Sequence, residues 1–540
     1  MTRGHGHTAP QGAQQARRRA RRTTAGWALI LGVALTVSSC SVMPWSRNPD
    51  SDLPGAASTP GMGTPPPGQE ALAPFYGQKL SWSGCGKIMS SNAECAWMDV
   101  PIDYGNPGGD RMKLRVLKVP AGDKSHGALF VNPGGPGGSA TEYAAQANMI
   151  VTPRVRSHYD IVGVDPRGVG QSSPIVCLDD TAMDDMMGAD PVPTTPEGRA
   201  KAESIAKSFG QACQRKYPKM LGHVSTIDAA KDMDIARAVL GQSTLTYLGK
   251  SYGTYLGSTY ADLFPTKVGR LVLDGVMTPD LTDAQLSLGQ AEGFETATRA
   301  YAKDCLDKGE CPLTGANVDE ALVSLREILA KVNTSPPSVS GDTRVRQLTP
   351  GWAWMGVAHG MYSQDQWPLV TAALHAMKRG NGNAMFDLAK RYANRGPDGH
   401  YQGNIMQVIS AVNCLDHPAE KMNDAQRDAQ IAEFSKVAPT WGPYMAGASY
   451  TCMNWPVPPV GKPHKVAAEG APPILVVGTT RDPATPYKWA QELARQLKKG
   501  RLVTFDGDGH TAYTRSNRCV DNTVDDYLIE GKVPDRDVTC

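Results

Sequence analysis

Short apolar runs of four or five residues recur along the chain, bounded by glycine, proline and polar positions. Such runs are typical of strands that are buried on both faces of a parallel sheet. They cluster between about residue 95 and residue 276 and resume at residue 474. The clearest are 128–131, 161–164, 245–248, 270–273, 474–478 and 501–505. The pattern predicts an α/β protein with a mostly parallel, doubly wound sheet.

The stretch between these two groups of runs has a helical pattern instead. Residues 318–329 place apolar side chains at helical spacing, with polar residues between them. We therefore expect a helical cap over 280–468, inserted between core segments 78–279 and 469–540. Residues 226–237 start with a capping residue and predict the helix before the strand at 245–248. In doubly wound sheets ligands bind at the carboxyl ends of the strands, so the cap is expected to cover the active site.

Ser251 lies at the centre of Gly-Lys-Ser-Tyr-Gly at 249–253, directly after the run 245–248. A strand followed by a sharp turn is the setting of a nucleophile elbow, where glycines flank the serine because the backbones approach closely. The same spacing also arises by chance, since the chain has 56 glycines. The interpretation of Ser251 as a nucleophile therefore depends on its partners.

Two candidate partners follow downstream in the chain order Ser, Asp, His. Asp482 comes after the run 474–478, and His510 comes after the run 501–505. His510 would take the serine proton, and Asp482 would fix the imidazole tautomer. Asp508 and Asp274 compete with Asp482 for the acid, although Asp274 fits a structural carboxylate at a strand end better. His510 could otherwise be an ordinary surface histidine.

A loop rich in glycine and proline at 132–139 follows the run 128–131. Its position predicts that the loop lends a backbone N–H to an oxyanion hole, with Gly135 as one donor and the N–H of Tyr252 as the second. The alternative is a plain turn. A third strand and tight loop, at 161–173, is expected to support the elbow.

Five motifs together resemble one family. They are Pro-Gly-Gly-Pro-Gly-Gly at 133–138, Asp-Pro-Arg-Gly-x-Gly-x-Ser at 165–172, Gly-Lys-Ser-Tyr-Gly at 249–253, Arg-Asp-Pro-Ala-Thr-Pro at 481–486 and Gly-Asp-Gly-His-Thr at 507–511. The chain resembles the secreted tripeptidyl aminopeptidases of actinobacteria and the mycobacterial cell-envelope serine proteases of the carboxylesterase A type, over roughly residues 78–540. The resemblance implies the α/β-hydrolase fold and a triad of Ser251, Asp482 and His510. Asn132 and Pro133 replace the histidine that precedes Gly-Gly-Pro-Gly in proline iminopeptidases, which argues against a proline-only specificity.

The first 40 residues are typical of an export signal. Six arginines and no acidic residue lie in 1–39, and a short apolar segment at 25–37 precedes Ser38, Ser39 and Cys40. Small residues before a cysteine resemble a lipoprotein signal, so 1–39 is expected to be removed and Cys40 to carry the lipid. Residues 40–77 would then be a flexible tether to the membrane of the cell envelope. An ordinary secretory peptide, with release of the protein, is the alternative.

Charge and cysteine content limit the classes of partner and cofactor that the chain is expected to bind. The net charge is +2, with 55 basic and 53 acidic residues, which indicates neither nucleic acid nor an anionic membrane surface as a partner. Without Cys40, ten of the 11 cysteines remain, an even number suited to disulfides in an oxidising compartment. Closeness along the chain favours the pairs Cys85–Cys95, Cys177–Cys213, Cys305–Cys311, Cys414–Cys452 and Cys519–Cys540. The spacing of metal ligands in common motifs is absent from the sequence, and no metal or cofactor is predicted.

Three functions fit these residues. The first is a peptidase that removes short peptides from free N-termini; the second is an esterase on acyl esters or envelope lipids with the same triad; the third is a binding protein that keeps the fold without catalysis. An aminopeptidase needs a carboxylate for the substrate ammonium. Glu292, Glu295 and Asp416 are candidates by location alone, and Trp352, Trp354 and Trp441 either line a pocket or form the core of the cap.

Overall fold

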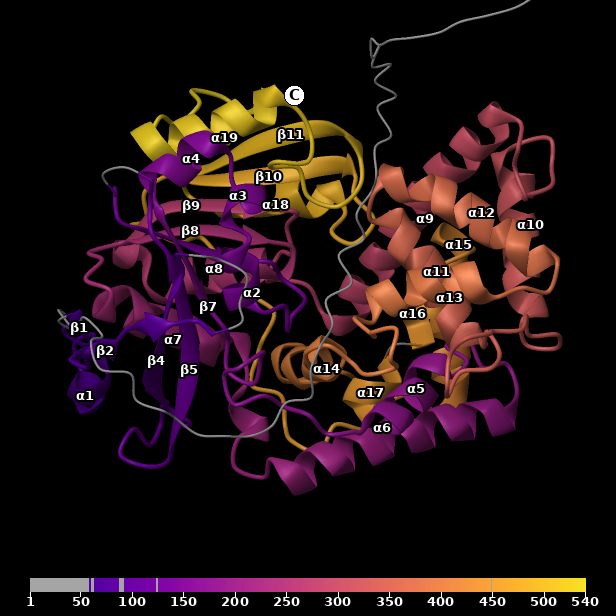
Figure 1. Cartoon of the computed structure of the whole chain (residues 1–540), viewed down its shortest axis with the longest axis horizontal. Helices are drawn as coiled ribbons and strands as arrows, with labels where there is room; N and C mark the ends of the chain where they lie inside the picture. Colours follow the sequence, from indigo (N-terminus) through magenta and orange to yellow (C-terminus); the bar gives the residue numbers. More distant parts are fainter. Residues whose placement is uncertain (1–57, 60–62, 87–91, 123–124, 448) are drawn as a thin grey trace, which may run out of the picture. The chain divides into compact units, whose positions relative to one another are not determined.

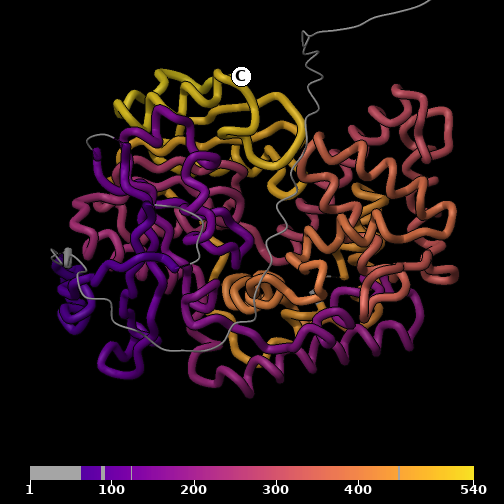
Figure 2. The backbone as a smooth tube through the Cα atoms, viewed as in Figure 1, coloured from indigo at the N-terminus to yellow at the C-terminus, as the bar shows by residue number. Residues whose placement is uncertain are grey.

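The computed structural model describes residues 58–59, 63–86, 92–122, 125–447 and 449–540 (Figure 1; Figure 2 follows the same backbone). The predicted signal peptide 1–39 and Cys40 lie outside the described residues. Within the described ranges, no helix combines the length and the apolar character that a membrane span requires.

Ten strands of the described chain form one sheet, in the order β12-β11-β10-β9-β8-β6-β7-β5-β4-β3. All neighbours from β12 to β7 are parallel, whereas the last three pairs, from β7 to β3, are antiparallel. The strands are β3 Ser83–Gly84, β4 Glu94–Pro101, β5 Arg111–Val119, β6 Ala128–Asn132, β7 Asp160–Val164, β8 Leu245–Lys250, β9 Val268–Asp274, β10 Ile474–Arg481, β11 Gly500–Asp508 and β12 Val538–Thr539. Two short strands, β1 Ser58–Thr59 and β2 Leu80–Ser81, pair separately. The mostly parallel sheet predicted from the apolar runs is confirmed.

Helices cover both faces of this sheet (Figure 1). On one face, the apolar residues of α7 (Thr226–Val239), α8 (Tyr252–Leu263) and α18 (Tyr487–Gln496) join the core with alternate strand residues such as Val476. On the other face, Leu475 and Val477 pack with α2 (Ala140–Ala145), α3 (Ala147–Ile150), α4 (Pro153–His158) and α19 (Arg518–Glu530). Strands buried on both faces must be apolar throughout, which explains the continuous runs in the sequence.

The cap has an apolar core of its own, built mainly from helices between β9 and β10. These helices are α9 Asp283–Lys308, α10 Val318–Lys331, α11 Pro350–Met361, α12 Trp367–Lys378, α13 Asn383–Tyr392 and α16 Gly442–Gly447. The same segment also holds α15 Asp424–Val437 and α17 Ser449–Met453. The helix predicted at 318–329 is α10. The helix predicted at 226–237 is α7, although Ser225 rather than Thr226 caps it, through a hydrogen bond from Asp228 N.

The division between core and cap differs from the predicted segments 78–279 and 280–468. Helices α5 (Asp180–Gly188) and α6 (Pro196–Lys216) precede the elbow in the chain but pack on α11 and α17 of the cap. Asp184 of α5 pairs with Arg344 and Arg395, with a closest N–O distance of 2.7 Å to each. Conversely, α14 (Ile405–Asp416) lies within the predicted cap segment, yet its residues Val408, Ala411, Val412 and Leu415 belong to the apolar core of the sheet.

The described part of the predicted tether 40–77 packs on the core. The short helix α1 (Ala73–Tyr76) follows a turn of 3₁₀ helix at Glu70–Leu72, and Leu72, Phe75 and Tyr76 are buried. Tyr76 donates a hydrogen bond of 2.8 Å to the buried Asp234 of α7. Apolar side chains and a buried hydroxyl that finds an acceptor fix this segment, so at least these residues belong to the folded domain rather than to a flexible tether.

Five disulfides join the pairs that chain proximity favoured: Cys85–Cys95, Cys177–Cys213, Cys305–Cys311, Cys414–Cys452 and Cys519–Cys540. Two of them link an element that packs on the sheet to an element that packs on the cap. Cys177–Cys213 ties α6 to the loop after β7, and Cys414–Cys452 ties α14 to α17. The bridges thus hold the inserted helices to the sheet.

Candidate active site

Ser251 sits in a sharp turn between β8 and α8, with φ of 56° and ψ of −127°. A non-glycine residue rarely adopts positive φ, and it persists only where the surroundings hold it. The flanking glycines are required because a side chain at either position would collide with the backbone. A Cβ on Gly249 would lie 2.3 Å from the carbonyl oxygen of Gly253, and one on Gly253 would lie 2.9 Å from the carbonyl oxygen of Asn132. The turn therefore has the strand-elbow-helix geometry that the sequence predicts.

Asp482 and His510 meet in the loops that follow β10 and β11. The distances from His510 Nδ1 to the two Asp482 oxygens are 2.8 and 3.0 Å, and both side chains are buried. The N–H groups of Ala484 and Thr485 donate to one Asp482 oxygen, and Thr511 N–H donates to the other. A carboxylate held by three backbone donors fixes the proton on Nδ1 and leaves Nε2 as the acceptor.

The two competing carboxylates have other partners. Asp508 pairs with Arg481 at 2.8 Å. Asp274 is fully buried, and its carboxylate accepts hydrogen bonds from the N–H groups of Ala512 and Tyr513. Lys250 Nζ lies 3.6 Å from Asp274 and donates to the carbonyl of Tyr513. Asp274 therefore anchors the loop that carries His510, which is the structural role expected for it.

The strand order brings Ser251 and His510 to the same sheet edge. Ser251 N–H donates to the carbonyl of Asp274 at 2.9 Å, and the next residue, Gly275, adjoins the imidazole: a Cβ there would lie 3.3 Å from His510 Cε1. In the described chain no hydrogen bond joins Ser251 Oγ to His510. Catalytic hydrogen bonds in unliganded enzymes are often long and shorten when substrate binds.

The loop rich in glycine passes directly beside the elbow. A Cβ on Gly134 would lie 2.8 Å from Ser251 Cβ and 3.1 Å from Tyr252 N. Gly134 N–H donates to the Asn132 side chain, and Gly138 N–H donates to the Gly134 carbonyl. Among the described residues, the N–H groups of Gly135 and Tyr252 have no hydrogen-bond partner. Two unpaired donors beside the serine are the requirement for an oxyanion hole.

The third predicted loop, at 165–173, supports this arrangement through buried charges. The Asp165 carboxylate accepts hydrogen bonds from Ser139 Oγ, Thr141 N–H and Gln171 N–H, and so ties the end of the glycine loop to the sheet. Arg167 is fully buried and forms two hydrogen bonds of 2.7 Å with Asp232 of α7. These contacts match the supporting role expected from the sequence.

Tyr362 of the cap, directly after α11, also contacts the imidazole. Its carbonyl accepts the His510 N–H at 2.9 Å, and its ring meets the imidazole edge-on at 5.3 Å between centroids. No sequence signal points to this residue, because Tyr362 follows a cap helix and belongs to no recognisable motif. The contact brings the cap to the candidate triad.

A cavity of about 370 Å³ lies among the cap helices, α6 and α14. Tyr392 lines it, and the ring of Tyr392 is 5.9 Å from that of Tyr362, the residue that contacts His510. Its lining includes Met186, Met187, Met355, Met406, Ile205, Ile409 and Tyr444. Asp190 is the one charged residue among the described residues of the lining. This is a pocket for an apolar group with one carboxylate at its wall.

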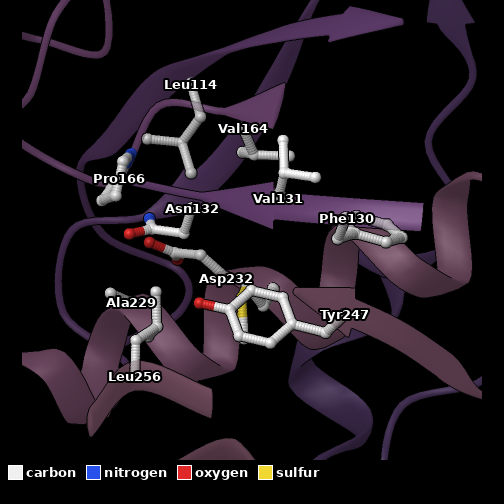
Figure 3. A pocket seen from close by; sticks show the side chains of 11 residues that line it. Leu114, Phe130, Val131, Asn132, Val164, Pro166, Ala229, Asp232, Tyr247 and Leu256 are labelled. Atoms are coloured by element: carbon white, nitrogen blue, oxygen red, sulfur yellow. The ribbon is translucent and has the colours of Figure 1, made fainter. Parts of the chain in front are cut away.

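A much smaller cavity, of about 20 Å³, lies inside the core between β6 and α7 (Figure 3). Asn132, Asp232 and Tyr247 line it together with apolar side chains. Its volume is close to that of one water molecule, so it is too small for any substrate group.

The three acidic candidates for a substrate amine are each bound to other groups of the protein. Glu292 pairs with Lys488. Glu295 is buried and accepts hydrogen bonds from the N–H groups of Thr440 and Trp441. Asp416 is buried and accepts hydrogen bonds from Thr226 N–H and Thr226 Oγ1. Of the candidate aromatics, Trp352 and Trp441 are fully buried in the cap core, and Trp354 packs against Trp441 at 5.2 Å.

The proteins similar to this chain are named as hydrolases of related kinds. A family model described as TAP-like protein matches residues 438–540. The chain is 38% identical over 483 residues to the serine protease Hip1 of Mycobacterium tuberculosis, covering 86% of this chain and 92% of that protein. It is 37% identical over 504 residues to carboxylesterase B of the same species, covering 90% and 94%. It is 32% identical over 483 residues to the tripeptidyl aminopeptidase of Streptomyces lividans, covering 85% and 86%.

Proposed function

We propose that this chain cleaves peptide bonds near free N-termini with Ser251, His510 and Asp482. The chain belongs to the family of α/β-hydrolases that includes serine protease Hip1 and the Streptomyces tripeptidyl aminopeptidase, and it is therefore a serine hydrolase. The observation that carries the proposed residue roles is the buried Asp482–His510 pair at the sheet edge where the Ser251 elbow lies. A strained serine, a histidine with its Nδ1 side fixed and two unpaired N–H donors form a complete set for acyl transfer.

The chemistry follows from these positions. Ser251 Oγ attacks the carbonyl carbon while His510 Nε2 takes the hydroxyl proton, and Asp482 stabilises the imidazolium. The C–N bond then breaks, and His510 gives the proton to the leaving amine, which leaves an acyl group on Ser251. Water, deprotonated by the same imidazole, then attacks the acyl carbon. The bond to Ser251 Oγ breaks, the acid product leaves, and His510 returns the proton to Oγ. The N–H groups of Gly135 and Tyr252 stabilise the oxyanion in both steps.

We assign the cavity beside Tyr392 to the N-terminal residues of the peptide. A lining of methionine, isoleucine and tyrosine suits apolar side chains, since methionine adapts to different shapes. Asp190 is half-buried at the wall, and one of its oxygens accepts the N–H of Val192 at 2.9 Å. The other oxygen is our candidate partner for the substrate ammonium, in place of Glu292, Glu295 and Asp416, which are engaged within the protein.

Hydrolysis of esters is the second candidate function. It is favoured by the relative named carboxylesterase B, whose identity to this chain is nearly that of the protease, and by the apolar lining of the same cavity, which also suits an acyl chain. The two functions use the same triad and differ in the group that fills the cavity.

One panel separates these functions. Wild-type enzyme and Ser251→Ala are compared on tripeptide amides with a free amine, on the same peptides after N-acetylation, and on short and long acyl esters. Cleavage that needs Ser251 and is lost on acetylation supports the aminopeptidase. Ester turnover without peptide cleavage would make the chain an esterase. Equal rates for the two proteins on every substrate would contradict the assignment of Ser251.

We also propose that the protein is exported and anchored to the cell envelope by a lipid on Cys40. The proposal is supported by the basic and apolar segments before Cys40 and by ten further cysteines in five disulfides, which suit an oxidising compartment. Mass spectrometry of the native N-terminus tests it, with Cys40→Ala as the control. Detection of an unmodified N-terminus beyond Cys40 would contradict the anchor.

A further inference from the structure

Helix α14 contacts the structure on both sides of the elbow, although its sequence lies in the cap insertion. We propose that α14 holds the two halves of the oxyanion hole in place, with Asp416 and Thr226 as positioning residues for Tyr252 and Asn404 as the anchor on the side of the glycine loop. This inference rests on the proposed function, because it concerns the donors Gly135 and Tyr252.

The C-terminal end of α14 reaches Tyr252 through a chain of hydrogen bonds. Thr226 Oγ1 donates to Asp416 at 2.6 Å, and Thr226 N–H donates to the other Asp416 oxygen at 2.9 Å. The hydroxyl of Tyr252 contacts Thr226 Oγ1. Thr226 has one hydroxyl proton, so when it donates to an ionised Asp416, the Tyr252 hydroxyl must be the donor to Thr226. The side chain of the residue after the nucleophile is thereby fixed to α14.

The N-terminal end of α14 contacts the glycine loop. A Cβ on Gly137 would lie 2.3 Å from Val408 Cγ1 and 3.2 Å from Ile405 Cα, so the loop backbone rests directly on the helix. Asn404, buried just before the helix, donates to the carbonyls of Gly168 and Ile175 and accepts the N–H of Gly170. These bonds fix the start of α14 to the loop after β7. That loop in turn holds the end of the glycine loop through Asp165.

Catalysis is sensitive to this arrangement because an oxyanion donor acts only within a few tenths of an ångström of its place. Ser251 has a strained backbone that the surroundings must hold. Thr254 Oγ1 and Thr254 N–H donate to the Ser251 carbonyl, and the Tyr247 hydroxyl donates to the Gly253 carbonyl. The Tyr252 hydroxyl adds a further bond. This bond connects the elbow to Thr226 of α7 and, through Thr226, to Asp416 of α14.

The bond between Thr226 and Asp416 depends on protonation. Burial raises the pKa of Asp416 to about 7, and the nearby Asp228 acts in the same direction. The other groups that face it are Tyr252 and Tyr255 of α8, both of which burial keeps protonated by raising the pKa, and His417, whose pKa burial lowers to about 4. A protonated Asp416 can donate to Thr226 Oγ1, which frees the Thr226 proton to point toward the Tyr252 oxygen. In that reversed arrangement the Tyr252 hydroxyl no longer donates to Thr226.

The test removes one bond at a time and measures catalysis and stability together. Thr226→Val and Tyr252→Phe are compared with Thr226→Ser, which restores the hydroxyl, and with Tyr260→Phe as a matched control. Tyr260 is a buried tyrosine of the same helix whose hydroxyl donates to Asp234 at 2.9 Å, away from the elbow. All variants are assayed for kcat, KM, Tm and the affinity of a peptide aldehyde, which forms an oxyanion on Ser251.

We expect Thr226→Val and Tyr252→Phe to lower kcat by about 10- to 100-fold with KM within about twofold of the wild type, and to weaken aldehyde binding in parallel. Thr226→Ser should recover most of the activity. Tyr260→Phe should lower Tm alone. The inference is overturned if the first two variants keep kcat within about twofold of the wild type, or lose no more than Tyr260→Phe loses.

The pH profile gives a second readout. Asp416→Asn resembles the protonated acid, so we expect reduced kcat at pH 8 and an acid limb of kcat/KM that involves one proton fewer than that of the wild type. An acid limb unchanged from the wild type would contradict the role of Asp416.

Labelling of Ser251 by a fluorophosphonate shows separately whether the proposed function holds. If the wild type neither labels nor turns over substrate, that function and this inference are both contradicted.

Discussion

Tyr362 of the cap holds His510 of the core by two contacts, a backbone hydrogen bond of 2.9 Å and an edge-on ring contact of 5.3 Å. His510, the proposed catalytic base, is therefore positioned from both sides. Asp482 fixes its imidazole from within the core, and Tyr362 fixes its backbone from the cap. The cap therefore contributes a contact to the candidate active site.

Removing the Tyr362 ring should lower activity more than stability. In Tyr362→Ala the imidazole loses its neighbour in the cap, so we expect kcat/KM to fall about 10-fold, because a small misplacement of the base is costly. Tyr362→Phe keeps the ring and should stay within about threefold of the wild type. Steady-state kinetics with Tm measurements check this, and equal loss in both variants would argue against a role for the ring.

Replacing the two carboxylates near His510 should give opposite results. Asp482→Asn keeps the shape but removes the charge that fixes the tautomer, so kcat should fall by about 10⁴-fold. Asp508→Asn breaks a pair with Arg481 and should leave kcat within a few-fold. The measurement is kcat on whichever substrate the wild type cleaves. An Asp482→Asn enzyme with undiminished kcat would refute the assignment of the acid.

A methyl group on Gly134 should lower activity strongly. The Cβ of Gly134→Ala would press on Ser251 Cβ at 2.8 Å, in a loop with φ of +97°. We expect a loss of about 100-fold or more in kcat. Gly241→Ala is the matched control, since Gly241 also has positive φ, at +69°, but open space around its Cβ. That variant should lose about 1 kcal/mol of stability and keep its kcat.

The Asp190 carboxylate should distinguish free amines from blocked ones. Asp190→Asn is expected to raise KM about 10-fold for peptides with a free N-terminus, because it removes the proposed partner of the ammonium. Turnover of acyl esters should not change. Parallel KM measurements on both substrates test the assignment, and an equal effect on the esters would mean that Asp190 shapes the cavity without binding an amine.

Asp416 should make stability fall as the pH rises. Its folded pKa, about 7, lies above the value near 4 of an unfolded aspartate, so the native state binds the proton more tightly. The resulting stabilisation is fully present below about pH 4 and is lost as the pH rises through 7. Denaturant unfolding of wild type and Asp416→Asn at several pH values measures the difference in the free energy of unfolding. A difference that does not vary with pH would contradict the raised pKa.

The elbow, the loops that carry Asp482 and His510, and the disulfide pairs could be predicted from the sequence because each has a local signal. A strand run followed by glycines marks Ser251 and His510, and short separations mark the cysteine pairs. The packing of α5 and α6 on the cap has no such signal, since Asp184 lies 160 residues from Arg344 and 211 from Arg395. Likewise, the sequence of α14 does not distinguish it from the cap helices, and only its contacts with Gly137 and Thr226 place it at the core.

The position of α5 and α6 has a mechanical consequence. The cap is built from two insertions, one before the elbow strand β8 and one after β9, so the chain enters and leaves it at two separate places in the sheet. A lid attached by one insertion can swing about a single hinge, whereas this one would have to bend both connections in concert. The disulfide Cys177–Cys213 further ties one of these insertions to the core. Rotation of the whole cap is therefore restrained, and substrates should reach Ser251 through openings between the helices.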